Sequence, residues 1–373
     1  MGDDRSGDGS SLAADLRAAG IAGGLARVGV ASVEPLVEAR VAIEQRLADG
    51  HDAGMQFTFR NPARSTDPRT ALPSARAAVV GLATYPAALD LQPAPTEPMG
   101  RVAWYATEDH YARLDAGLQA IAAVLRDRGH RAVVVADANA LVDRAIAERA
   151  GLGWFGKNAN LLAPGLGSWF VIGSVLTDAP LAAHDAPLGD GCGSCRRCLP
   201  ACPTGAIVAP GVIDARRCLA WLVQRDGDIE PWARVAMGDR IYGCDDCQEA
   251  CPPDRQLARG PQSSAPSGRF ISLVDLLACD DETLLARHGR WYLPRRDPSV
   301  LRRNALVALG NVGDGDDRRV VDAVARHLAH PSAMVRRHAV WAARRLGLDR
   351  LLDAVAADPD PGVRAEAIAE VRA

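Results

Sequence analysis

Residues 192–203 of this chain read CGSCRRCLPACP, and residues 244–252 read CDDCQEACP. Together with Cys218, which lies between them, they hold eight of the nine cysteines. The first stretch has the spacing in which three thiolates bind one 4Fe-4S cluster and a fourth, followed by proline, reaches a second cluster. A segment rich in Cys, Gly, Pro and Asp gains its folding energy from metal binding rather than from a large apolar core. We therefore expect residues 186–258 to fold around two 4Fe-4S clusters.

The second stretch lacks a third closely spaced cysteine, and Cys218 fills that vacancy. We assign one cluster to Cys192, Cys195, Cys198 and Cys251, and the other to Cys202, Cys218, Cys244 and Cys247. Two alternatives stay open on the spacing, namely two structural zinc ions or reduced core cysteines. Zinc sites usually use separated CxxC pairs rather than a CxxCxxC run, which favours the clusters. The ninth cysteine, Cys279, lies in an apolar stretch and is expected to be a buried core thiol.

The composition is that of a soluble globular protein. The 373 residues are 48% hydrophobic and 24% charged, with a net charge of -3. No apolar run approaches the roughly 18 residues that would span a membrane, and the first residues lack the basic and apolar regions of a signal peptide. We therefore expect a cytoplasmic chain without a membrane partner. In that reducing compartment, dense cysteines bind metal more often than they form disulfides.

The region before the cysteines alternates helical and strand-like patterns. A helical stripe of leucine and isoleucine runs from Leu114 to Leu125. Apolar and β-branched runs predict strands at 77–83, 133–135 and 169–176. This alternation predicts an α/β domain over residues 11–185.

The region after the cysteines contains three related segments, which begin at Leu301, Val335 and Val363. Each follows a proline and carries an apolar stripe of helical period. Such repetition predicts a short array of helical repeats over residues 269–373. The polar stretch 260–268, GPQSSAPSG, is the expected linker;.

Residues 147–158, AERAGLGWFGKN, contain three glycines and Lys157, the only lysine of the chain. Glycines at this density let a backbone turn tightly or approach a large ligand. A helix end followed by a turn explains Gly151 and Gly153, but it does not explain Lys157. The pattern fits neither a phosphate-binding loop nor a dinucleotide fingerprint, so no phosphate site is inferred.

Several segments taken together resemble those of the epoxyqueuosine reductases, cobalamin-dependent enzymes that complete queuosine in tRNA. Besides the first cysteine stretch, the matching segments are GRVAWYATEDHYARL at 100–114, AERAGLGWFGKN at 147–158, GSWFVIG at 167–173, DARRCLAWL at 214–222 and GDRIYGCDDCQEACP at 238–252. The resemblance implies a modified nitroreductase-like α/β domain at 11–185 that binds cobalamin. It further implies a ferredoxin-like domain at 186–258 and HEAT-like repeats at 269–373 that bind tRNA.

The resemblance also implies a reaction. Electrons that pass through the clusters reduce the cobalamin cobalt to the cob(I) state, which reduces the epoxide of epoxyqueuosine at the wobble position of tRNA to the alkene of queuosine. Asp137 matches the proton donor of the family. An aspartate needs desolvation or a neighbouring negative charge to keep its proton at neutral pH. The alternative is that Asp137 caps a helix from Asn139 onward. The sequence Asp137-Ala138-Asn139-Ala140 also lacks the proline that many members have here.

Nine positions match family contacts to cobalamin. They are Arg60, Ala103, Tyr105, Asp137, Lys157, Leu161, Ile172, Ala215 and Tyr242. Several such contacts use backbone atoms in the family, so side-chain identity is a poor guide to them.

The repeats contain five arginine pairs, Arg295-Arg296, Arg302-Arg303, Arg318-Arg319, Arg336-Arg337 and Arg344-Arg345. Arginine forks bind phosphate well, although such pairs on helical repeats usually form a solvated face. The expected partners are the anticodon stem-loop of tRNA that carries epoxyqueuosine and an unidentified low-potential electron donor. We expect a monomer.

Two other functions are weighed against this one. A reductive dehalogenase also couples cobalamin to two clusters, but it predicts a twin-arginine export signal and no helical repeats. A ferredoxin-like electron carrier would use the α/β domain only to bind a protein partner. The repeats and the absence of an export signal favour the reductase.

Overall fold

The computed structural model describes residues 5–89, 97–183, 188–258 and 268–369. Contacts divide the chain into two compact units. Unit 1 takes residues 1–89, 108–216 and 246–265, and unit 2 takes residues 90–107, 217–245 and 266–373. The cysteine-rich segment 186–258 contributes residues to both units. The expected linker 260–268 lies outside the described residues except for Gly268.

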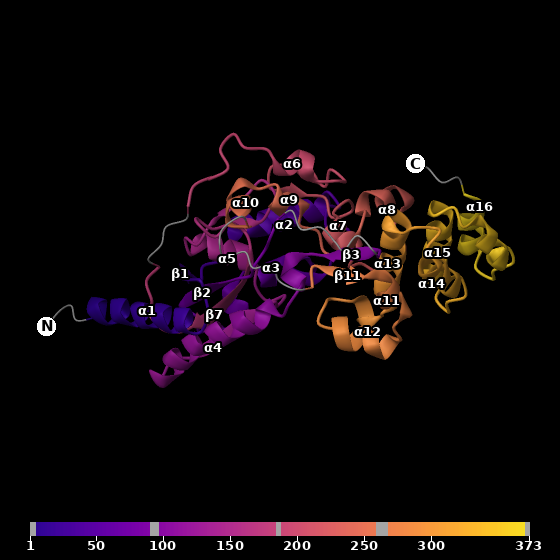
Figure 1. The fold of residues 1–373 in the computed structure, drawn as a ribbon. Helices are drawn as coiled ribbons and strands as arrows, with labels where there is room; N and C mark the ends of the chain where they lie inside the picture. Colours follow the sequence, from indigo (N-terminus) through magenta and orange to yellow (C-terminus); the bar gives the residue numbers. More distant parts are fainter. Residues whose placement is uncertain (1–4, 90–96, 184–187, 259–267, 370–373) are drawn as a thin grey trace. The chain divides into compact units, whose positions relative to one another are not determined.

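Unit 1 is built on a four-stranded antiparallel sheet with the strand order β1-β2-β7-β4 (Figure 1). Its strands are β1 (Arg27–Ser32), β2 (Ala77–Thr84), β4 (Ala132–Ala136) and β7 (Phe170–Thr177). The three strands predicted from apolar runs are thereby confirmed. The two central strands, β2 and β7, are almost entirely buried, which explains why their sequences are continuously apolar;.

Helices cover both faces of this sheet. On one face α4 (His110–Asp127) packs against β2, β4 and β7, and α1 (Arg5–Ala22) packs beside it (Figure 1). The predicted stripe of α4 faces the sheet, where Leu114 and Leu118 are fully buried. A Cβ on Gly173 of β7 would lie 2.6 Å from Leu118, so this close approach requires glycine. On the other face α5 (Asp143–Arg149) joins an apolar cluster that includes Val80 and Leu82.

Smaller elements complete unit 1. They are α2 (Val37–Ala48), η1 (Phe57–Arg60), α3 (Pro62–Ser65), η2 (Pro68–Thr70), β5 (Trp154–Phe155), β6 (Leu161–Leu162), α6 (Cys198–Ala201), β8 (Ile207–Ala209), β9 (Val212–Ile213), α9 (Asp246–Glu249) and α10 (Pro252–Ala258), where η denotes a 3-10 helix. The short lengths of α6, α9 and α10 agree with a segment that folds around bound metal rather than around its own apolar core.

Unit 2 combines a small mixed sheet with helical repeats. The sheet has the order β10-β3-β11, from β3 (Met99–Val102), β10 (Arg240–Tyr242) and β11 (Phe270–Ser272). Its helices are η3 (Trp104–Ala106), α7 (Leu219–Leu222), α8 (Pro231–Met237), α11 (Leu273–Ala278), α12 (Asp281–His288), η4 (Pro294–Arg296), α13 (Ser299–Val312), α14 (Arg318–Leu328), α15 (Ala333–Arg345), η5 (Asp349–Val355) and α16 (Pro361–Ile368).

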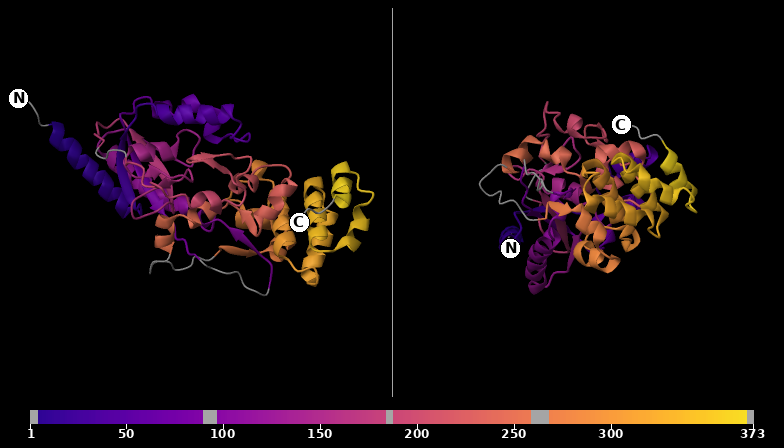
Figure 2. Two further views of the ribbon diagram at one scale, coloured as in Figure 1. Left: turned by 90° about the horizontal axis from the view of Figure 1, so that it is seen from above. Right: turned by 45° about the vertical axis from the view of Figure 1, so that its right-hand side comes forward.

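The predicted repeats are confirmed, because their three segments lie in α13, α15 and α16. These helices pack against one another, with α14 beside α15, in the orange-to-yellow part of Figures 1 and 2. Gly310 of α13 touches α15 so closely that a Cβ there would lie 2.6 Å from the Trp341 ring. The expectation for Cys279 is wrong: this residue ends α11 and is only half-buried.

Two neighbouring polar residues of α13, Arg303 and Asn304, are fully buried. The Arg303 guanidinium donates to the carbonyls of Leu222 and Val223, both at 3.2 Å. The Asn304 amide donates to the carbonyl of Val223 at 2.7 Å and to that of Ile241 at 2.9 Å. Burial lowers the pKa of Arg303 to about 9. The first repeat helix therefore satisfies backbone groups at the end of α7 and in β10.

Candidate functional site

Asp137 follows the last residue of β4, with a φ of +47°. This left-handed conformation costs a non-glycine residue about 1–2 kcal/mol, and such strained residues cluster at functional sites. The side chain is exposed, yet desolvation by the surrounding protein raises the pKa of its carboxyl. The alternative in which Asp137 caps a helix from Asn139 is wrong, because α5 begins at Asp143 after Val142.

A second acidic residue lies near Asp137. Burial, reinforced by the charge of Asp137, raises the pKa of Asp143 to about 8, while Arg144 opposes the shift. Oxygen Oδ1 of Asp143 is buried and has no hydrogen-bond partner among the described residues. Burial, then Asp137 and Asp143, also raises the pKa of Tyr111. Sequence reasoning missed Asp143, which no motif marks, and Tyr111, which lies in the matching segment at 100–114 but was not singled out there.

Four cysteines of unit 1 affect one another electrostatically. The Cys195 amide donates to the Cys192 carbonyl at 2.9 Å. This hydrogen bond closes the first turn of residues 192–198, which we call the cysteine loop. Burial raises the pKa of the Cys198 thiol, with smaller contributions from Cys192 and Cys195. Burial likewise raises the pKa of Cys251 to about 12, and Cys192 and Cys198 contribute. Cys251, far along the chain, therefore lies within electrostatic reach of the first stretch.

The other four predicted ligands have defined local structure, and one of them, Cys247, lies in α9 of unit 1. In unit 1, the Cys202 sulfur accepts from the Ala206 amide at 3.1 Å. In unit 2, Cys218 precedes α7 as its N-cap residue. Cys244 follows β10 through Gly243, whose φ is +72° and whose Cβ would lie 2.4 Å from that of Ala103.

A buried ion pair fixes the chain beside Cys244. Asp245 accepts from the Trp104 amide and from Arg269, both at 2.7 Å. The Arg269 guanidinium also lies 4.5 Å from the centre of the Trp104 ring. These contacts join the cysteine-bearing segment to the chain that follows β3.

Cysteine thiolates are the ligands that iron-sulfur clusters use. All nine cysteines lie in the described ranges, and none of them forms a disulfide. The donor set therefore fits thiolate-bound clusters. Residues 191–254 match the family of 4Fe-4S double cluster binding domains, and residues 291–372 match HEAT repeats.

Curated relatives extend the likeness to most of the chain. An epoxyqueuosine reductase of Xanthomonas campestris is 33% identical over 354 residues, covering 91% of this chain and 98% of the relative. That of Bacillus cereus is 30% identical over 346 residues, covering 89% and 88%.

The chain belongs to the epoxyqueuosine reductase family.

Solved structures agree with this assignment. One epoxyqueuosine reductase, crystallised with an epoxyqueuosine-modified tRNA stem loop, has 27% identity and a TM-score of 0.87, over 96% of this chain and 97% of that one. The enzyme from Bacillus subtilis, described with its catalytic aspartate loop swung out of the active site, has 26% identity and a TM-score of 0.86, over 96% and 97%.

Residues matching cobalamin contacts of epoxyqueuosine reductases occur in both units. In unit 1, Arg60 is exposed at the end of η1, Leu161 and Ala215 are buried, and Ile172 of β7 is half-buried. In unit 2 three of them lie together, namely Ala103, Tyr105 and Tyr242. The Ala103 amide donates to the Tyr242 carbonyl at 2.8 Å, and the two tyrosine rings are 6.3 Å apart. Their contact with cobalamin stays a prediction.

The lone lysine of the chain binds backbone of the cysteine loop. Lys157 Nζ donates to the carbonyls of Gly193 at 2.5 Å and Cys195 at 3.0 Å. The next residue, Asn158, donates to the carbonyl of Cys247 at 3.4 Å. The turn at residues 156–158, whose role could not be predicted from the sequence, thus contacts both cysteine stretches. Contact of Lys157 with cobalamin stays a prediction.

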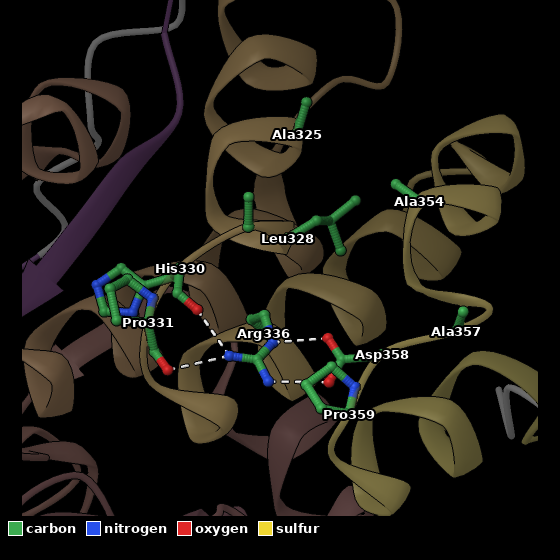
Figure 3. A pocket seen from close by; sticks show the side chains of 10 residues that line it. Ala325, Leu328, His330, Pro331, Arg336, Ala354, Ala357, Asp358 and Pro359 are labelled. Atoms are coloured by element: carbon green, nitrogen blue, oxygen red, sulfur yellow. Dashed lines mark hydrogen bonds and ion pairs between the residues drawn. The ribbon is translucent and has the colours of Figure 1, made fainter.

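Five of the ten arginines in the predicted pairs form contacts inside the fold. The repeats contain a pocket of about 440 Å³. In Figure 3, Arg336 in this pocket points toward Asp358 and the carbonyls of His330 and Pro331. Arg337 pairs with Asp228 and Asp360. Arg302, Arg303 and Arg344 are likewise engaged with carboxylates or backbone carbonyls. These five arginines stabilise the fold, whereas Arg295, Arg318 and Arg319 keep exposed side chains.

In the part of the chain that the structure describes, no helix is long and apolar enough to cross a membrane.

Proposed function

We propose that this chain reduces epoxyqueuosine to queuosine at the wobble position of tRNA. The observation that carries the proposal is a likeness to epoxyqueuosine reductases over about nine tenths of the chain, with both cysteine stretches and Asp137 in place. The net change removes the epoxide oxygen as water and leaves an alkene. This reduction consumes two electrons and two protons. The chain must therefore bind an electron carrier, a proton donor and the tRNA.

The clusters supply the electrons in this proposal. The first is held by Cys192, Cys195, Cys198 and Cys251, and the second by Cys202, Cys218, Cys244 and Cys247. The mutual electrostatic reach of Cys192, Cys198 and Cys251 supports the first set. Cysteines that cross between stretches keep two clusters close together.

Cobalamin, when bound, supplies a low-valent cobalt that acts as nucleophile and reductant toward the epoxide. The fold proposed for its domain is nitroreductase-like. Exposed Arg60 offers a cation for the phosphate of the cofactor tail, and apolar Leu161 and Ile172 suit the edge of a corrin. Asp137, beside the unpartnered carboxyl oxygen of Asp143, holds a proton for the departing epoxide oxygen. The raised pKa of Asp137 supports this role because a general acid must carry its proton near neutral pH;.

The remaining parts of the proposal concern partners and place. The HEAT repeats bind the anticodon stem-loop, an unidentified low-potential donor reduces the clusters, and the protein acts in the cytoplasm as a monomer. A related structure that contains a modified tRNA stem loop supports the tRNA partner.

The test is anaerobic incubation of the reconstituted protein with epoxyqueuosine-containing tRNA, cobalamin and a low-potential reductant. Nucleoside mass analysis should show a product lighter by one oxygen atom. The same incubation without cobalamin is the control and should leave the tRNA unchanged. Unchanged tRNA in the complete mixture, with both clusters and cobalamin shown spectroscopically to be bound, would refute the proposal.

A further inference from the structure

We propose that Lys157 is a positioning residue for the first 4Fe-4S cluster. The Lys157 ammonium holds the cysteine loop at Gly193 and Cys195, and its charge stabilises the reduced form of the cluster. The inference rests on the cluster-binding part of the proposed function and not on the reaction with tRNA. It gives a role to the only lysine of the chain.

The Lys157 ammonium lies against the first turn of the cysteine loop, between Cys192 and Cys195. Lys157 Nζ donates to the carbonyls of Gly193 and Cys195, which flank Ser194. Gly193 has a φ of +49°, and a Cβ there would meet nothing within 4 Å. Glycine is thus required by conformation and not by space. This conformation turns the Gly193 carbonyl toward the lysine, so one side chain fixes both sides of the loop.

The lysine is itself held in place by its own turn. The Gly211 amide donates to the Lys157 carbonyl at 3.0 Å. Gly156 lies so close to Asn158 that a Cβ would lie 2.8 Å from the amide oxygen of that side chain. Asn158 is buried and donates to the carbonyl of Cys247. Residues 156–158 thereby brace the backbone of both cysteine stretches.

Charge is the second part of the argument. Among the described residues no carboxylate forms an ion pair with Lys157, and its ammonium instead contacts two backbone carbonyls. Reduction adds one negative charge to a cluster, and cluster potentials depend on net charge, hydrogen bonds and solvent exposure. A half-buried cation beside the loop therefore stabilises the reduced form.

The choice of lysine in an arginine-rich chain fits this geometry. An ammonium is a compact charge with three donors that can point at two converging carbonyls. A guanidinium is planar and larger, and its donors have a fixed fork. Arginine at this position would keep the charge but change the loop contacts. The two effects can thus be separated by substitution.

The experiment compares Lys157→Gln, Lys157→Arg and the control Arg196→Gln in the reconstituted full chain. Arg196 is exposed in the same loop, so its replacement removes one charge that water already screens;. The readout is the midpoint potential of each cluster, from redox titration followed by electron paramagnetic resonance, together with iron and sulfide content.

For Lys157→Gln we expect the equilibrium constant for reduction of one cluster to fall about tenfold, a shift of about 59 mV to more negative potential. Lys157→Arg should keep the potential closer to that of the wild type, and Arg196→Gln should shift it less than Lys157→Gln does. Equal potentials in the wild type and Lys157→Gln, or an equal shift in Arg196→Gln, would overturn the proposal. Because potentials are measured without tRNA, this outcome is independent of turnover.

A second measurement covers the case in which Lys157→Gln fails to take up iron. Because Lys157 is the only lysine, an amine-specific acylating reagent reports on its ε-amine and on the chain terminus alone. In the native cluster-loaded wild type, we expect slow labelling of Lys157 that becomes fast after cluster removal with a chelator. Labelling that is equally fast in both states would show that the ammonium does not hold the loop.

Discussion

Replacement of Asp143 by Asn should remove a pH-dependent loss of stability. The folded chain keeps a proton on Asp143 up to a pKa of about 8, whereas the ordinary value is 3.8. Between these two values the native state binds a proton that the unfolded state has released. Stability therefore falls as pH rises, by about 1.4 kcal/mol per pH unit, and the loss ends above the folded pKa. The groups that face Asp143 are Asp137, Tyr111 and Arg144.

Between pH 6 and pH 8, proton binding by folded Asp143 lowers the free energy of unfolding of the wild type by about 2 kcal/mol. This value is an upper bound because buried sites relax and admit water. Asn has the same shape and no charge. Between pH 6 and pH 8, the free energy of unfolding of Asp143→Asn should therefore fall by about 2 kcal/mol less than that of the wild type. The measurement is anaerobic urea unfolding at both pH values, followed by circular dichroism. Asp127→Asn, at an exposed position in the last turn of α4, is the matched control and should behave as the wild type. Parallel pH dependence in the wild type and Asp143→Asn would mean that Asp143 is ionised in the folded chain.

Three further substitutions test other parts of the structure. Asp137→Asn should leave iron content and cobalamin binding unchanged while nucleoside analysis shows no queuosine; turnover near the wild-type rate would remove Asp137 from the mechanism. Asn304→Ala removes the side-chain donor to the Ile241 carbonyl and one of two donors to the Val223 carbonyl, and it should lower the free energy of unfolding by about 1–3 kcal/mol, with wild-type stability as the contrary result. Arg336→Ala breaks a partly buried ion pair with Asp358 and should cost about 1–3 kcal/mol in stability, while the salt dependence of tRNA binding stays the same; a shallower salt slope would place Arg336 on the tRNA instead.

Features that depend on local pattern could be predicted from the sequence. The strands at 77–84 and 170–177 are buried on both faces, so their residues are apolar without interruption. The stripe of α4 follows helical period because one side of that helix meets the sheet;. The cysteine stretches are recognisable because cluster geometry fixes the spacing of nearby ligands.

Features that depend on distant parts of the chain could not be predicted in this way. The pKa of Asp143 depends on burial and on Asp137, which the fold brings near. The partners of Lys157 lie 36 and 38 residues further along the chain. Nothing in the pattern of an arginine pair distinguishes a phosphate ligand from Arg303, whose charge is surrounded by backbone carbonyls.

The contacts of Arg303 and Asn304 limit where the chain can be divided. Helix α13 is assigned by its sequence to the repeats, but its side chains donate to the carbonyls of Val223, in the segment that follows Cys218, and of Ile241, in the strand that precedes Cys244. A truncation before this helix would leave those carbonyls unpaired and loosen two residues assigned to a cluster. A designer who wishes to exchange the repeats for another RNA-binding module should therefore place the junction after Val312. The first repeat helix is inseparable from the electron-transfer part of the molecule.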